Sequence, residues 1–192
     1  MEDIINNIEK NWFETGHLNI NQRNYLIELL TELKPKNCLE IGFASGRSLV
    51  TIYFSCKPER LLSIDIDLDY IKGAREFIEK LKKEFNNVFV LERDSTKINF
   101  NILNKNYFMN KGVDFAFIDG GHTYEICMLD LNNVYKISHK GTVILIDDYK
   151  SSFPDGYFLP EVTNAVDDFI KKYDLILSTW YMNGKGFAKI TI

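Results

Sequence analysis

Short apolar runs alternate with amphipathic stretches along most of this 192-residue chain, and this alternation restricts the folds that the chain can adopt. Short continuous apolar runs are typical of strands that are buried on both faces. Helical stretches between such strands predict a parallel sheet with helices on both faces. The predicted strands are Cys38–Ile41, Leu61–Ile66, Val88–Leu91, Val113–Ile118, Thr142–Ile146, Leu175–Trp180 and Gly186–Ile192.

The last two predicted strands are joined by a very short connection, with little more than Met182–Lys185 between them. A crossover between parallel strands needs about a dozen residues or more, so these two strands must pair antiparallel. We therefore expect an α/β fold: a doubly wound, Rossmann-like sheet of five parallel strands plus a C-terminal antiparallel hairpin. In such a sheet, ligands bind outside the carboxyl ends of the parallel strands.

Apolar residues three and four positions apart predict the helices. This spacing occurs at Leu26–Leu33, Ile71–Phe85 and Val162–Tyr173, and a short helix is predicted near residues 4–12. The stretch Thr123–Ile137 is apolar on more than one side, which predicts a well-buried helix.

The length of the chain suits one domain, since domains typically hold roughly 100–200 residues. We expect residues 1–34 to form an N-terminal helical segment and residues 35–192 to form a single core domain. Residues 95–112 are rich in Asn and give no clear pattern.

The charge balance and the cysteines exclude several classes of function. Lys and Arg number 23 and Asp and Glu number 27, and the net charge of −4 offers no footprint for sequence-independent nucleic-acid binding. No apolar run approaches the roughly 18–20 residues that span a bilayer, and the N-terminus lacks the basic start and apolar core of a signal peptide. The three cysteines have no CxxC spacing, which argues against a disulfide framework or a zinc site. We expect a cytoplasmic protein that binds neither nucleic acid nor membranes.

The first predicted strand runs into Gly42 and Gly46, which allow a tight turn and a close approach to a ligand at the start of a helix. The GxxxG spacing differs from the GxGxxG of dinucleotide-binding proteins, which disfavours a nicotinamide oxidoreductase. Asp65 ends the second strand, where a carboxylate can accept both ribose hydroxyls of an adenosine or can cap the next helix. Asp94 and Ser95 follow the third strand, where the carboxylate could accept the adenine amino group or be an ordinary loop residue.

Three carboxylates follow the fourth and fifth strands, at Asp119, Asp147 and Asp148. Neighbouring parallel strands bring them to one edge of the sheet, where such close like charges need a cation or protons. Hard oxygen ligands suit Mg²⁺, with Ca²⁺ and Mn²⁺ as alternatives. His122 lies three residues past Asp119, and an imidazole suits a general base there, although a lone histidine is more often a surface or structural residue.

Together these residues resemble the class I S-adenosylmethionine-dependent methyltransferases, over about residues 25–192. The sequence is most similar to the small-molecule O-methyltransferases that use a divalent metal, of the catechol type and of the sugar-methylating macrocin type. The stretches FIDGGHTYE and ILIDDY carry most of this likeness. The sugar-methylating type has histidine at the place of His122, whereas the catechol type has lysine.

The resemblance implies a role for each residue at the strand ends. Glu40, Gly42 and Gly46 would line the methionine part of the cofactor, Ser48 would hold its carboxylate, Asp65 would bind the ribose, and Asp94 with Ser95 would bind the adenine. Asp119, Asp147 and Asp148 would hold the metal, Asp119 would also lie at the cofactor and in the catalytic centre, and His122 would be the base. The implied cofactors are S-adenosylmethionine and a divalent metal, with Mg²⁺ first, and the implied acceptor is a small hydroxylated molecule such as a sugar or polyketide.

Two other functions stay open. A metal-independent methyltransferase of the same fold could act on nitrogen or another small acceptor, with the acids after the fifth strand structural. A non-catalytic scaffold is a third alternative, although an idle site would not need buried like charges. The chain lacks the proline-rich signature of nucleic-acid amino-methylases, because Asp119 is followed by Gly120 and Gly121.

Acceptor recognition could come from the first 34 residues or from residues 149–160, which form either an aromatic lid or a surface loop. It could also come from a second subunit, so a homodimer is an additional expectation.

Overall fold

The computed structural model describes residues 18–152 and 160–192. The helix predicted near residues 4–12 lies outside the described residues. The same holds for Phe153, Tyr157 and Phe158, the aromatic residues of the segment that could form either a lid or a surface loop. Among the described residues, no helix combines the length and the apolar character that crossing a membrane requires.

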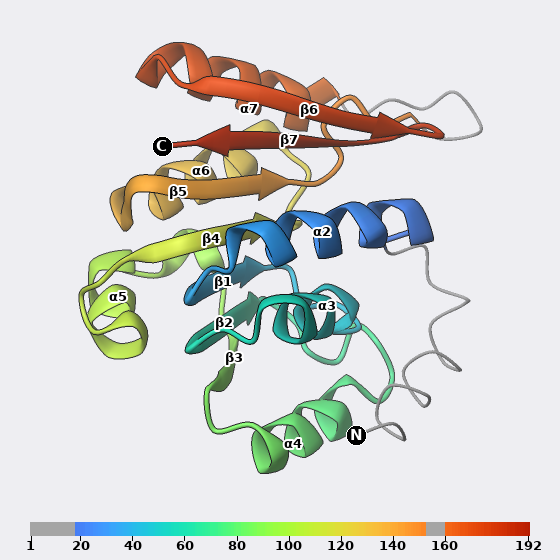
Figure 1. Ribbon diagram of the computed structural model, residues 1–192, viewed down its shortest axis with the longest axis vertical. Coiled ribbons are helices and arrows are strands. Elements are labelled where there is room, and N and C mark those ends of the chain that lie inside the picture. The colour runs from blue at the N-terminus through green and yellow to red at the C-terminus, as the bar shows by residue number, and fades with distance from the viewer. Residues whose placement is uncertain (1–17, 153–159) are drawn as a thin grey trace.

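Seven strands form one sheet in the order β3-β2-β1-β4-β5-β7-β6 (Figure 1). β1 to β5 are mutually parallel, and β7 lies antiparallel between β5 and β6. The predicted fold class is therefore confirmed, including the C-terminal antiparallel hairpin. The strands are β1 (Asn37–Ile41), β2 (Arg60–Asp65), β3 (Val88–Glu92), β4 (Val113–Ile118), β5 (Ser138–Ile146), β6 (Ile176–Met182) and β7 (Lys185–Thr191).

Helices cover both faces of the sheet, and each face has its own apolar cluster. α2, α3 and α4 pack on one face, and α5, α6 and α7 pack on the other. The helices are α2 (Ile20–Leu33), α3 (Arg47–Cys56), α4 (Ala74–Glu84), η1 (Ser95–Lys97), α5 (Phe100–Phe108), α6 (Tyr124–Lys136) and α7 (Pro160–Tyr173).

The helix α5 lies in the stretch that gave no pattern in the sequence. It is only nine residues long, and the Asn99 side chain caps it by accepting hydrogen bonds from the backbone N–H groups of Asn101 and Ile102. Three of its residues, Phe100, Leu103 and Phe108, are buried. A helix of this length is too short to show a clear period, and Asn is as common in loops as at helix starts.

Successive side chains of β1 point to opposite faces of the sheet. Leu39 and Ile41 belong to the cluster under α5, α6 and α7, whereas Cys38 belongs to the cluster under α2, α3 and α4. Because both faces are covered, the strand is buried throughout. Glu40, on the same face as Cys38, is therefore a carboxyl group inside an apolar layer.

The loops after β1, β4 and β5 lie next to one another at the carboxyl edge of the sheet. Backbone hydrogen bonds continue beyond the strands: Asp119 donates to the carbonyl of Ile41 at 2.8 Å, and Asp147 donates to that of Ile118 at 3.0 Å. This order of loops places the predicted site residues in one region.

Candidate active site

The turn after β1 depends on Gly42. Its φ of +100° lies in the left-handed region, and a Cβ there would come 1.9 Å from the carbonyl oxygen of Asp119. Any side chain would therefore push the β1 and β4 loops apart. Gly46, with φ of +79°, directly precedes α3, and a Cβ there would press on the rings of Phe77 and Phe43. The two glycines thus form a tight turn directly against the loop that carries Asp119.

Asp65 holds this turn in place. Its Oδ2 accepts hydrogen bonds from the backbone N–H groups of Phe43 at 2.8 Å and Ala44 at 2.9 Å, and its Oδ1 accepts one from Asp67 at 3.0 Å. The carboxylate therefore orders the glycine turn and the start of its own loop. Its ribose-binding role stays a prediction.

Glu40 is fully buried beside this turn. The Ser63 hydroxyl donates to Glu40 Oε2, while Oε1 has no hydrogen-bond partner among the described residues. Burial raises the pKa of Glu40 to about 8, although the hydroxyls of Ser48 and Ser63 lower it in part. Ser48 itself is buried in the first turn of α3. A buried carboxyl with an unsatisfied oxygen is costly to the fold and suits a site that receives a cation.

Asp94 and Ser95 lie at the start of η1. The Asp94 carboxylate accepts hydrogen bonds from the backbone and hydroxyl of Thr96 and pairs with Lys97 Nζ at 2.9 Å. The hydrogen bonds from Lys97 and Thr96 lower the pKa of Asp94 to about 2. In this state the carboxylate is committed to its own loop, and its adenine-binding role stays a prediction.

Sequence reasoning missed Asp130, on α6, which lies under the same region. It is fully buried, and neither carboxylate oxygen has a hydrogen-bond partner among the described residues. A Cβ on Gly120 would come 3.2 Å from Asp130 Oδ2, so the carboxyl lies against the loop after β4. Burial raises the pKa of Asp130 to about 6, and the Ser95 hydroxyl lowers it in part.

Three of the predicted residues form a close cluster at the ends of β4 and β5: Asp119, His122 and Asp148. Each offers a ligand atom, and these atoms lie within 4.8 Å of one another. His122 Nε2 is 3.3 Å from Asp148 Oδ2 and 3.9 Å from Asp119 Oδ1. Asp119 and Asp148 raise the pKa of His122, against the opposing effects of burial and Lys185. We call these three residues the acidic cluster.

Local structure explains how the acidic cluster forms. The Thr123 side chain caps α6 by accepting a hydrogen bond from Ile126 N–H, which fixes the chain directly after His122. Glu161 of α7 accepts a hydrogen bond from the Tyr124 N–H at 2.9 Å. Asp148 has φ of +57°, a left-handed conformation that Asp and Asn tolerate better than most residues.

Asp147, the third predicted metal ligand, has a different environment. Its Oδ1 accepts hydrogen bonds from Gln22 Nε2 of α2 and from the backbone N–H of Asp148, both at 2.8 Å. Burial, followed by the charges of Asp119 and Asp148, raises the pKa of Asp147 well above its usual range. The structure therefore places Asp147 beside the acidic cluster, with one oxygen committed to α2.

Lys185, at the start of β7, also reaches this region, and the sequence gave no sign of it. Its Nζ lies 3.1 Å from Asp148 Oδ1. The side chains are partly shielded, with 23% of Lys185 and 8% of Asp148 exposed. Asp148 thus has His122 near one oxygen and Lys185 on the other.

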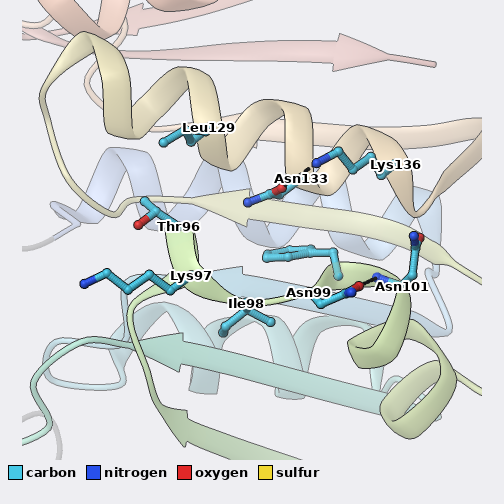
Figure 2. Close-up of a pocket in the computed structure, with 9 residues that line it drawn as sticks. Thr96, Lys97, Ile98, Asn99, Asn101, Leu129, Asn133 and Lys136 are labelled. Atoms are coloured by element: carbon cyan, nitrogen blue, oxygen red, sulfur yellow. Dashed lines mark hydrogen bonds between the residues drawn. The ribbon is translucent and has the colours of Figure 1, made fainter.

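Two further features lie outside this site. Asp67, Asp69 and Glu92 also come close together, but Arg75 pairs with both Asp69 and Glu92 at 2.6 Å. A groove of about 480 Å³ lies between the η1–α5 segment and α6 (Figure 2). The groove contains none of the predicted site residues, and its lining includes Lys97 and Lys136.

Comparison with known proteins gives the family. The sequence model of the family described as "Methyltransferase domain" matches residues 39–149, from β1 to just beyond the acids that follow β5. The chain belongs to this methyltransferase family. The match contains the glycine turn and the whole acidic cluster.

One curated relative and several solved structures resemble this methyltransferase. Uncharacterized protein R132 of Acanthamoeba polyphaga mimivirus is 33% identical over 172 residues, which cover 85% of this chain and 72% of the relative. The O-methyltransferase from Bacillus cereus, solved in complex with SAH, has a TM-score of 0.72 at 19% identity, covering 100% of this chain and 90% of that one. TomG from Streptomyces achromogenes, an O-methyltransferase solved with SAM, has a TM-score of 0.73 at 16% identity, covering 100% and 88%. At these identities the solved structures establish the methyltransferase fold.

The described residues of this methyltransferase fit both implied cofactors. The orphaned oxygen of Glu40, beside the glycine turn, suits a positively charged ligand. The two carboxylates of the acidic cluster, Asp119 and Asp148, are ligand types that Mg²⁺ or Mn²⁺ accepts.

Proposed function

We propose that this chain transfers a methyl group from S-adenosylmethionine to a hydroxyl group of a small acceptor, such as a sugar or polyketide, with the help of a divalent metal. The observation that carries the proposal is the acidic cluster, which lies beside the glycine turn at the carboxyl edge of the sheet. The solved proteins of this fold that are O-methyltransferases support the choice of oxygen as acceptor.

The reaction needs the protein to activate the acceptor hydroxyl and to align it with the methyl group. S-adenosylmethionine, held at the glycine turn and Glu40, would supply the methyl group: the acceptor oxygen would bond to the methyl carbon as the sulfur–carbon bond breaks, which would leave a neutral thioether. A divalent cation at Asp119 and Asp148 would supply a lower pKa for the acceptor hydroxyl. His122 Nε2 can take the hydroxyl proton, because it lies at the same edge as both carboxylates. The glycine turn would hold S-adenosylmethionine. Much of the remaining barrier is then the alignment of the acceptor oxygen with the methyl carbon and the sulfur.

Activity should depend on pH through His122. A base must be neutral, and Asp119 and Asp148 raise the pKa of His122 above its ordinary value near 6.5. We expect kcat/KM to fall about tenfold per pH unit below this raised pKa and to level off above it. A pH profile of the wild type checks this result, and the His122→Asn variant should lose that limb. A profile that keeps the same limb in the variant would assign the proton transfer to another group.

A thermal-shift series tests cofactor and metal separately. The protein is heated with S-adenosylhomocysteine, with NADH or with buffer alone, each in Mg²⁺ or EDTA. A ligand at 100 times its Kd stabilises by about 2.7 kcal/mol, which for a domain of this size is a shift of roughly 5–10 °C. We expect a shift with S-adenosylhomocysteine, none with NADH, and a further effect of Mg²⁺.

Other results of this series would redirect the proposal. A shift with S-adenosylhomocysteine that is the same in Mg²⁺ and EDTA would favour the metal-independent methyltransferase. No shift from folded protein would favour the scaffold.

A further inference from the structure

The Lys185 side chain lies against the acidic cluster because the β6–β7 hairpin is fixed there. The turn of the hairpin is only two residues long, and both residues have positive φ, +53° at Asn183 and +79° at Gly184. This is the geometry of a type I′ turn, which the Asn-Gly pair favours. Lys185 is the next residue, so the turn determines where its side chain starts.

The residues on both sides of Lys185 contact the β5–α7 connection closely. Ser152 N–H donates to the Gly184 carbonyl at 2.7 Å, and Gly186 N–H donates to Ser151 Oγ at 3.1 Å. A Cβ on Gly184 would come 2.8 Å from the carbonyl oxygen of Ser152, and one on Gly186 would come 2.2 Å from that of Tyr149. The backbone at Lys185 is thus held against the segment that follows Asp148.

In this arrangement, each carboxylate oxygen of Asp148 has a nitrogen atom close to it. Lys185 Nζ lies 3.1 Å from Oδ1, and His122 Nε2 lies 3.3 Å from Oδ2. The ammonium also acts on the rest of the site, because its charge lowers the pKa values of His122 and Asp147. A divalent cation that binds Asp148 has to share this carboxylate with a fixed positive charge or displace it.

We propose that the ammonium group of Lys185 competes with a divalent metal ion for the Asp148 carboxylate and thereby keeps the metal affinity of the acidic cluster low. The inference rests on the proposed function in so far as the acidic cluster is the metal site. Lys185 acts on the metal through Asp148, so it is a positioning residue.

The test measures Mn²⁺ affinity, without any need for the acceptor. Free Mn²⁺ is titrated by electron paramagnetic resonance into wild type, Lys185→Met and Lys185→Gln. Two unit charges about 4 Å apart near a protein surface interact by several times the thermal energy, and the Mn²⁺ ion is doubly charged. We expect the Kd for Mn²⁺ to fall roughly tenfold or more in both variants, after discounting for partial exposure.

Two controls separate the local effect from net charge. Lys185→Arg keeps the cation and should bind Mn²⁺ as the wild type does. Lys189→Met removes a lysine further along β7 and should leave the Kd unchanged. Melting temperatures of all variants show that they are folded.

The inference is overturned if the Kd for Mn²⁺ in both neutral variants equals or exceeds that of the wild type. It is also overturned if neither the wild type nor these variants bind Mn²⁺, or if Lys189→Met lowers the Kd as much as they do. The thermal shift with S-adenosylhomocysteine, measured on the same samples, tests the proposed function independently. Tighter Mn²⁺ binding without that shift would support the role of Lys185 and contradict methyl transfer.

Discussion

Replacing Asp148 with asparagine should lower methyl transfer by about a hundredfold to a thousandfold while leaving the affinity for S-adenosylhomocysteine nearly unchanged. Asp148 is the member of the acidic cluster that contacts both His122 and Lys185. Loss of its negative charge therefore weakens both of these contacts and the attraction of the cluster for a metal ion. The glycine turn, Glu40 and Asp65 lie outside these contacts and should hold the cofactor as before. Asparagine is preferable to alanine because the residue has φ of +57°, which asparagine tolerates well.

The measurement pairs initial rates with calorimetric titration of S-adenosylhomocysteine. The matched control is Asp168→Asn, which removes an exposed carboxylate of α7 that accepts a hydrogen bond from Tyr124. We expect the control to keep near-normal rates. Full activity in Asp148→Asn would show that the charge of Asp148 is dispensable, and full activity in Asp148→Ala, which removes the ligand oxygen as well, would eliminate the metal hypothesis. A parallel loss of rate and cofactor affinity would indicate a folding defect instead.

The sheet could be predicted from the sequence because burial on both faces leaves a simple signal. β1 and β4 are buried along almost their whole length, and the short connection before Lys185 permits only an antiparallel pair. The boundaries were less well defined: β5 begins at Ser138, four residues before the predicted start, because its first residues are exposed and polar. α5 was missed since it is short and rich in Asn.

The acidic cluster could also be predicted, because the carboxyl ends of neighbouring parallel strands share one edge. The register of β4 and β5, with Ile118 opposite Ile146, sets Asp119 beside Asp147 and Asp148. The partners of these acids could not be predicted in this way. Gln22 comes from α2 and Lys185 from the C-terminal hairpin, and only tertiary packing decides which side chain of such an element reaches the site.

Asp130 illustrates the same limit from inside a helix. Its position in α6 looks like an ordinary polar residue among apolar neighbours, yet it is fully buried against Gly120. The sequence predicts that this helix is well buried, but it does not show which group the Asp130 carboxyl lies against, because Gly120 belongs to the loop after β4. Residues whose role depends on packing between elements therefore have to be found in the structure.

Glu40→Gln should weaken S-adenosylhomocysteine binding by about tenfold to a hundredfold. The resemblance assigns Glu40 to the methionine part of the cofactor, and its Oε1 lacks a partner among the described residues. A charge-assisted hydrogen bond to an ammonium group contributes about 1.5–3 kcal/mol, which corresponds to this change in affinity. Calorimetric titration measures it, with Glu84→Gln, an exposed position at the end of α4, as the control that should behave as the wild type. Equal affinity in Glu40→Gln and wild type would remove Glu40 from the binding site.

The same substitution should make the ligand-free protein less sensitive to alkaline pH. Burial raises the pKa of Glu40 from an ordinary value of 4.5 to about 8, so the folded state favours the neutral carboxyl. The unfolded chain ionises first, and stability therefore falls as the pH rises from 4.5 through 8, by about 5 kcal/mol at most. Glutamine has no charge to bury, although its amide N–H₂ would take the place of the unpartnered oxygen and reduce the gain. Melting curves of both proteins across this range should converge at acidic pH and diverge near pH 8, with the variant more stable. Parallel curves would mean that Glu40 ionises at its ordinary pKa in the folded protein, and the site would then hold a full negative charge before any cofactor binds.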